Sequence, residues 1–80
     1  FRDFAEIATD YGVTQMAVPS SLVGRPLDLS AIWRTHRVQL VSVRRAEGEW
    51  APLADATELT PTDFIVAAGS PQALEKFSQC

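Results

Sequence analysis

Hydrophobic and polar positions divide this chain into short segments whose apolar period changes along the sequence. In residues 28–36 the apolar side chains of Leu29, Ile32 and Trp33 recur at the spacing of one helical face. Asp28 stands where its carboxylate would accept hydrogen bonds from the free N–H groups of the first turn. We therefore expect a short helix that Asp28 caps.

After this helix the apolar period changes to two. Residues 38–43 are rich in β-branched side chains, with Val38 and Leu40 on one side and Val41 and Val43 on the other. Such a pattern is typical of a strand that is buried on both faces. We expect this strand to lie centrally in a sheet.

The first residues of the chain show a helical spacing. Apolar side chains recur at Phe4, Ile7, Ala8 and Tyr11. Gly12 follows where a glycine often ends a helix. The pattern predicts a helix over residues 2–11.

Three further segments read as strands. Residues 13–18 alternate in the manner of a strand. The glycine-bearing turn at residues 46–49 predicts a hairpin that returns along residues 50–53, where Pro52 cannot donate to a ladder and favours an edge position. A third apolar strand is expected over residues 64–68.

The last part of the sequence predicts a tight turn and then the start of a helix. Residues 60–63, Thr-Pro-Thr-Asp, have the composition of a tight turn. Ser70 and Pro71 supply an N-cap and a first-turn proline for a closing helix, with Leu74 and Phe77 as its buried face.

These elements predict an α+β fold: a small, mostly antiparallel sheet of about four strands with two packed helices plus an N-terminal helix. Eighty residues form one small domain. We expect residues 1–12 to be an N-terminal helix or connecting segment and residues 13–80 to be the domain itself.

Charge and composition narrow the class of function. The net charge of −3 and pI near 4.9 argue against nucleic acid as a partner. Within this acidic chain, most of the arginines cluster in residues 25–45, so a local anion site is compatible with the sequence. The single cysteine, Cys80, excludes an internal disulfide and fits a reducing compartment. No apolar run reaches the length of a membrane span.

Reactive side chains are few. His36 and Cys80 could form a Cys–His pair on paper, but we expect a residue at the end of the chain to fray. A structural zinc site needs more nitrogen and sulfur ligands than these two. The four glycines are isolated, so no phosphate loop is present. We therefore expect a binding module without a cofactor rather than an enzyme.

The order of motifs resembles a known family. Residues 21–27 read S-L-V-G-R-P-L, and residues 58–69 read E-L-T-P-T-D-F-I-V-A-A-G. With the valine-rich strand ending in Arg44-Arg45 between them, this set resembles the TrkA-C domain, the C-terminal lobe of the regulator-of-potassium-conductance family, over residues 13–77. Thr62 departs from the glycine that is usual before Asp63, although Asp63 can still cap the turn.

The resemblance implies a cytosolic regulatory domain at the inner face of the membrane, attached to a potassium channel, a potassium-uptake subunit or another ion or anion transporter. Such lobes usually form homodimers, with a ligand site near the subunit interface between the first helix and the strand after it. A small anionic or nucleotide ligand would shift the orientation of the subunits. The nucleotide-binding Rossmann lobe of full-length members is not in this chain.

The resemblance places the candidate ligand-binding residues at the helix end and strand start: Trp33, Arg34, His36, Arg37 and Gln39. Trp33 and Gln39 stand where members that bind cyclic di-AMP tend to have arginine and asparagine. Each residue also has a plainer interpretation. Trp33 continues the core stripe, His36 would complement the helix dipole, and Arg37 and Gln39 would face solvent.

Two other classes remain open. A biotinyl or lipoyl carrier would need a lysine at an exposed hairpin tip, whereas Lys76, the single lysine, falls in the closing helix. A free-standing small-molecule sensor similar to the ACT modules has a comparable order of strands and helices.

Overall fold

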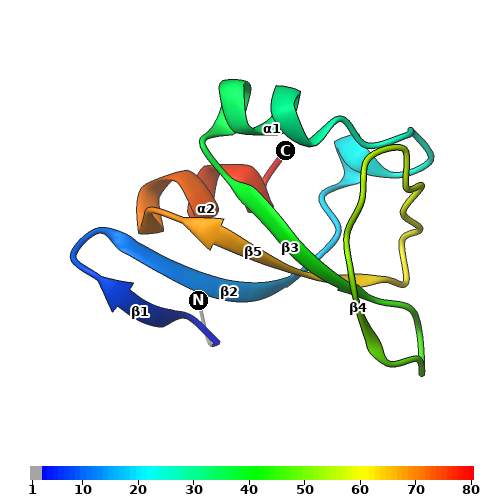
Figure 1. The fold of residues 1–80 in the computed structure, drawn as a ribbon, viewed down its shortest axis with the longest axis horizontal. Coiled ribbons are helices and arrows are strands. Elements are labelled where there is room, and N and C mark those ends of the chain that lie inside the picture. Colours follow the sequence, from blue (N-terminus) through cyan, green and yellow to red (C-terminus); the bar gives the residue numbers. More distant parts are fainter. Residues whose placement is uncertain (1–2) are drawn as a thin grey trace.

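The computed structural model describes residues 3–80 (Figure 1). Its elements, in chain order, are β1 (Ala5–Ala8), β2 (Tyr11–Ala17), the 3₁₀ turn η1 (Ser20–Leu22), α1 (Leu29–His36), β3 (Gln39–Arg44), β4 (Trp50–Pro52), β5 (Phe64–Gly69) and α2 (Pro71–Ser78). The strands form one antiparallel sheet in the order β1-β2-β5-β3-β4. The expected α+β class is confirmed, with five strands where about four were predicted.

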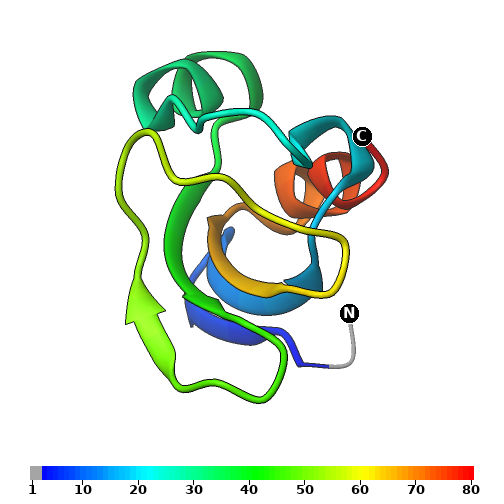
Figure 2. The ribbon, with the colours of Figure 1, turned by 90° about the vertical axis from the view of Figure 1, so that its right-hand side faces the viewer.

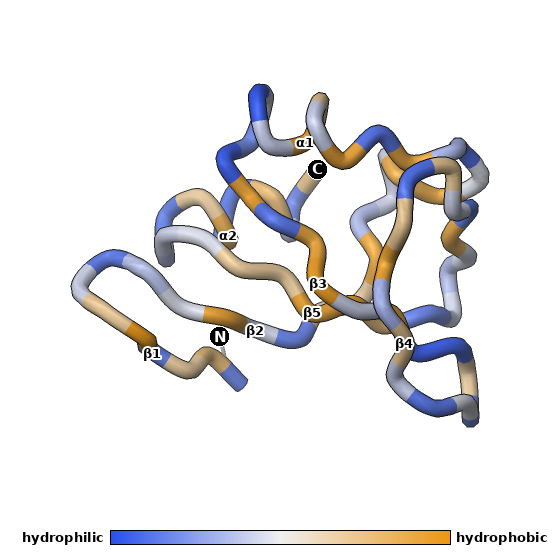
Figure 3. Tube along the Cα trace, in the orientation of Figure 1, coloured by the Kyte–Doolittle hydropathy of each residue, from blue (hydrophilic) through white to orange (hydrophobic). Residues whose placement is uncertain are grey.

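Both helices lie on the same side of the curved sheet, as Figure 2 shows. The core fills the space between them and the sheet: Ile32 from α1 and Leu74 and Phe77 from α2 pack in one cluster with Ile65 and Val43. Figure 3 shows that β3 and β5 are largely apolar where they pass beneath the helices. Burial of this one face is the main source of stability.

The prediction of a helix over residues 2–11 is wrong. Residues 5–8 and 11–17 instead form the antiparallel hairpin β1–β2, and Arg2, where the helix was expected to start, lies outside the described residues. Asp10 has a φ of 60°, a left-handed conformation that aspartate tolerates, and this allows a tight turn. Ile7, expected on a buried stripe, is 65% exposed. Residues 3–12 thus belong to the sheet.

Gly12 serves a different purpose from ending a helix. It lies in β2, and a Cβ there would come 2.4 Å from Cζ of Phe4 and 2.6 Å from the carbonyl oxygen of Ala5. The missing side chain lets the ring of Phe4 close over the strand. Spacing alone could not separate this role from that of a helix-ending glycine.

The strand over residues 38–43 is inside the sheet, between β5 and β4, but it is not buried on both faces. A register shift between Leu40 and Ser42 inserts one extra residue. Val43 therefore shares the buried face with Leu40, whereas Val41 is 46% exposed. The prediction from sequence missed this bulge because it assumed a strict period of two.

The predicted caps are confirmed. Asp28 accepts a hydrogen bond from the N–H of Ala31 at 3.0 Å, and Ser70 accepts one from Ala73 at 3.1 Å. Pro52 lies in β4, which is an edge strand, as its missing N–H predicted. Local capping chemistry thus fixes where both helices begin.

Asp63 organises the turn before β5. Its buried carboxylate accepts the N–H of Thr60 at 2.9 Å and pairs with the guanidinium of Arg45. Burial alone would raise the pKa of Asp63, but the Thr60 N–H and Arg45 outweigh it and lower the pKa. Thr62, where the TrkA-C pattern has glycine, has no positive φ, so this turn does not require glycine there.

We predict that Asp63→Asn destabilises the fold by about 1–3 kcal/mol at neutral pH, because it removes the charge from a buried hydrogen-bonded group. The pKa of Asp63 is lowered in the folded state, so its contribution is present above its ordinary pKa of 3.8 and is lost as the pH falls through the lower, folded value. Urea unfolding of wild type and variant at neutral and acid pH measures this contribution to the free energy of unfolding. The difference from wild type should shrink in acid, whereas the exposed control Asp3→Asn should show little effect at either pH.

Gly12→Ala should destabilise the β1–β2 hairpin by about 1–3 kcal/mol, because the added methyl group meets both Phe4 and backbone. Gly48→Ala is the matched control, since its nearest neighbour would be 3.5 Å away. Thermal unfolding of both variants tests the hairpin. Equal melting temperatures would contradict it.

Candidate functional site

One half of β3 lacks a strand neighbour on the side away from β5. β3 pairs with β5 from Gln39 to Arg44, whereas the three-residue β4 pairs only with Ser42–Arg44. The start of β3 is therefore flanked by α1 rather than by another strand. This arrangement leaves room for a groove between the helix and the sheet.

The groove has a volume of about 470 Å³. Its lining residues come from α1 and from the start of β3: Leu29, Ser30, Trp33, Arg34, Val38, Gln39 and Leu40. The half-buried Leu29 and the exposed Trp33 give it apolar surface, and Arg34 and Gln39 add polar groups. This mixture of apolar surface and a few polar groups is typical of small-molecule sites.

Trp33 is an exposed wall of this groove and not a core residue. Ile32 is buried, but Trp33 is 41% exposed, so its interpretation as part of the core is wrong. The guanidinium of Arg37 lies 5.2 Å from the centre of its ring. A flat aromatic surface with a cation beside it can stack against a planar ligand.

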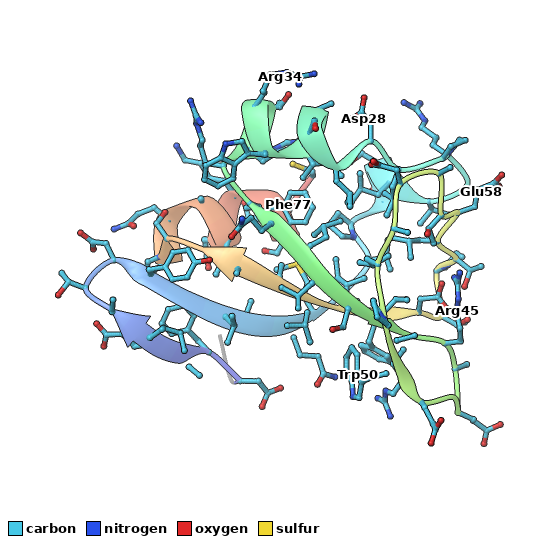
Figure 4. All side chains as sticks on the ribbon, viewed as in Figure 1. Asp28, Arg34, Arg45, Trp50, Glu58 and Phe77 are labelled. Atoms are coloured by element: carbon cyan, nitrogen blue, oxygen red, sulfur yellow. The ribbon has the colours of Figure 1, made fainter. Side chains whose placement is uncertain are left out.

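The polar groups of the groove come from both elements. Arg34 projects outward from the last turn of α1 in Figure 4. Gln39 is exposed, and its Oε1 accepts a hydrogen bond from the hydroxyl of Tyr11 at 2.8 Å. Sequence reasoning missed Tyr11 because it assigned that residue to a helix; only the fold of β2 brings it to β3.

The other two predicted residues lie elsewhere. His36 and Arg37 line a second depression of about 360 Å³, between the end of α1 and the start of α2. Trp33, Arg34 and Gln39 thus share one groove, and His36 lines the other depression. Arg37 lies between the two, because it lines the second depression while its guanidinium lies beside the Trp33 ring. This division could not be predicted from sequence patterns because it depends on where α2 packs.

Cys80 was expected to fray, but the structure holds it in place. Its carbonyl oxygen accepts hydrogen bonds from the hydroxyl of Ser20 and from the backbone N–H of Ser21. Its Sγ lies 4.0 Å from Nδ1 of His36. The imidazole otherwise meets the ring of Phe77 edge-on at 5.1 Å. No carboxylate is placed to orient it among the described residues, so the pair lacks the third member of a catalytic triad.

Three further features bear on the kind of site that residues 3–80 form. No group of three or more His, Cys, Asp or Glu side chains there is placed to hold a metal ion. Neither helix in that range is long and apolar enough to cross a membrane. Lys76, which a carrier domain would need at a hairpin tip, lies in α2.

Comparisons with protein-family models and with curated proteins found no match to this chain.

The exposure of Trp33 has a direct consequence for stability. Trp33→Ala should cost about 1 kcal/mol or less, because the ring stands at the surface, whereas Ile32→Ala beside it should cost about 2–5 kcal/mol. Urea unfolding of the two variants measures the difference. A larger loss of unfolding free energy for Trp33→Ala than for Ile32→Ala would show that Trp33 is a core residue.

Proposed function

We propose that this chain is a ligand-sensing regulatory domain of the TrkA-C type, which acts on a potassium channel or another ion or anion transporter from the cytosolic side. Its ligand is a small anion that carries a planar ring, of the nucleotide class. The groove between α1 and β3 carries this proposal, because three of the five residues that the resemblance assigned to ligand binding line it.

The chemistry of the groove supports that ligand class. Trp33 offers an exposed aromatic face, and Arg34 offers a charged fork that suits phosphate or carboxylate oxygens. Leu29, which is half-buried, adds apolar surface to the same groove. The same groove carries no acidic side chain that would repel an anion.

The roles of the family-like motifs are compatible with a regulatory rather than a catalytic domain. Gly24 has a φ of 77° and donates its N–H to the carbonyl of Leu59 at 3.0 Å. Asp63 holds the turn before β5. These residues build the scaffold, so the exposed groove is the part left free to recognise a ligand.

Regulation requires two arrangements that the ligand binds unequally. We propose that these are two relative orientations of a homodimer, with the open half of β3 and α1 near the partner subunit. A ligand seated there would contact both subunits and favour one orientation. The free strand edge beside the groove is consistent with such a neighbour.

A thermal-shift and calorimetry panel of nucleotides, cyclic dinucleotides and divalent ions tests the proposal. At 100 times its Kd, a ligand should stabilise the fold by about 2.7 kcal/mol, a rise of roughly ten degrees or more for a domain of this size. We expect such a response from an anionic nucleotide, with little from divalent ions alone.

Matched variants assign the response to the groove. Trp33→Ala and Arg34→Ala should abolish it, while Trp50→Ala and Arg25→Ala, which change exposed residues outside the groove, should keep it. Light scattering with and without ligand reports the dimer. A flat response to every nucleotide, or a response that survives in both groove variants, would contradict the proposal.

A further inference from the structure

The second depression, between the end of α1 and the start of α2, has a one-sided charge. Its lining residues are Thr35, His36, Arg37, Ser70, Gln72, Ala73 and Lys76. Arg37 and Lys76 are cationic, His36 carries an imidazole, and none of these lining residues is acidic. On a chain of net charge −3, this concentration is a local feature that the overall composition does not produce.

The backbone fixes Arg37 at the rim of this depression. Arg37 ends α1 in the left-handed conformation, with φ 57° and ψ 38°, and its N–H donates to the carbonyl of Trp33 at 2.9 Å. Its own carbonyl oxygen packs closely on Gly69, where an added Cβ would lie 3.0 Å away. Glycine is the usual residue at such a helix end, yet this position keeps a long charged side chain.

The first turn of α2 adds donors to the same depression. Ser70 caps the N–H of Ala73 at 3.1 Å, and Pro71 has no N–H. The N–H of Gln72 has no acceptor within the helix, because it belongs to the first turn. Lys76 lies one turn further along the same face, four residues after Gln72.

The two sides of the depression therefore offer different but complementary groups. Arg37 and His36 come from the end of α1, whereas Lys76 and Gln72, whose N–H belongs to the first helical turn, come from α2. His36 is held in place by its edge-on contact with Phe77, 5.1 Å between ring centres. Charge-assisted hydrogen bonds from several directions are what a compact oxyanion requires.

We infer that this depression binds a phosphate dianion, either free or as the end group of a phosphomonoester. Arg37 and Lys76 supply charge, and His36 and the first turn of α2 supply further donors. The depression adjoins the α1–β3 groove at Arg37, whose guanidinium lies 5.2 Å from the centre of the Trp33 ring. Phosphate binding here does not depend on the function proposed for that groove.

Amide chemical shifts of the whole chain test the inference, with inorganic phosphate as the probe and sodium chloride as the reference at constant ionic strength. Phosphate should move the amides of residues 35–37 and of Gln72 and Ala73 in a saturable way. Arg37→Gly should weaken this binding on the order of five-fold, the loss expected for one exposed charge. Because glycine favours a positive φ, the variant should melt no lower than wild type.

Arg25→Ala is the control, since the exposed Arg25 lines neither the α1–β3 groove nor this depression and its loss should leave phosphate binding unchanged. Glycerol 3-phosphate distinguishes the two sources of the anion: tighter binding than inorganic phosphate assigns an end group, and weaker binding assigns the free ion. Phosphate shifts no larger than those of chloride, or wild-type affinity in a well-folded Arg37→Gly protein, would overturn the inference.

Discussion

The short reach of β4 is the constraint on which the candidate site depends. β4 pairs with only the last three residues of β3, so the first half of β3 has a strand on one side and a helix on the other. Ile32 anchors α1 in the core, which holds the helix against the sheet at this place. A longer β4 would cover the edge and leave no groove.

Helix starts and the edge position of β4, which depend on a few neighbouring residues, could be predicted from the sequence. The carboxylate of Asp28, the Ser70–Pro71 pair and the proline in β4 each limit the local backbone, and each has the role that was expected. The first hairpin could not be predicted in this way. Its residues fit a helical spacing, and only the close approach of Phe4 to Gly12 and the positive φ of Asp10 separate the two structures.

The candidate site was predicted in part. The resemblance to the TrkA-C pattern pointed to the residues at the end of α1. It could not say that Trp33 and Arg34 would line one groove and His36 a second depression, with Arg37 between them. That division arises from the packing of α2, which is distant in sequence. Tyr11 was missed for the same reason, because its contact with Gln39 spans 28 residues.

Fluorescence of Trp33 tests the central claim most directly. The chain has two tryptophans, so in a Trp50→Phe background the emission reports on the α1–β3 groove alone. The account predicts that titration with adenosine monophosphate or a cyclic dinucleotide quenches this emission in a saturable way, as a base stacks on the indole. Unchanged emission of Trp33 at ligand concentrations that raise the melting temperature would place the binding site elsewhere and contradict the account.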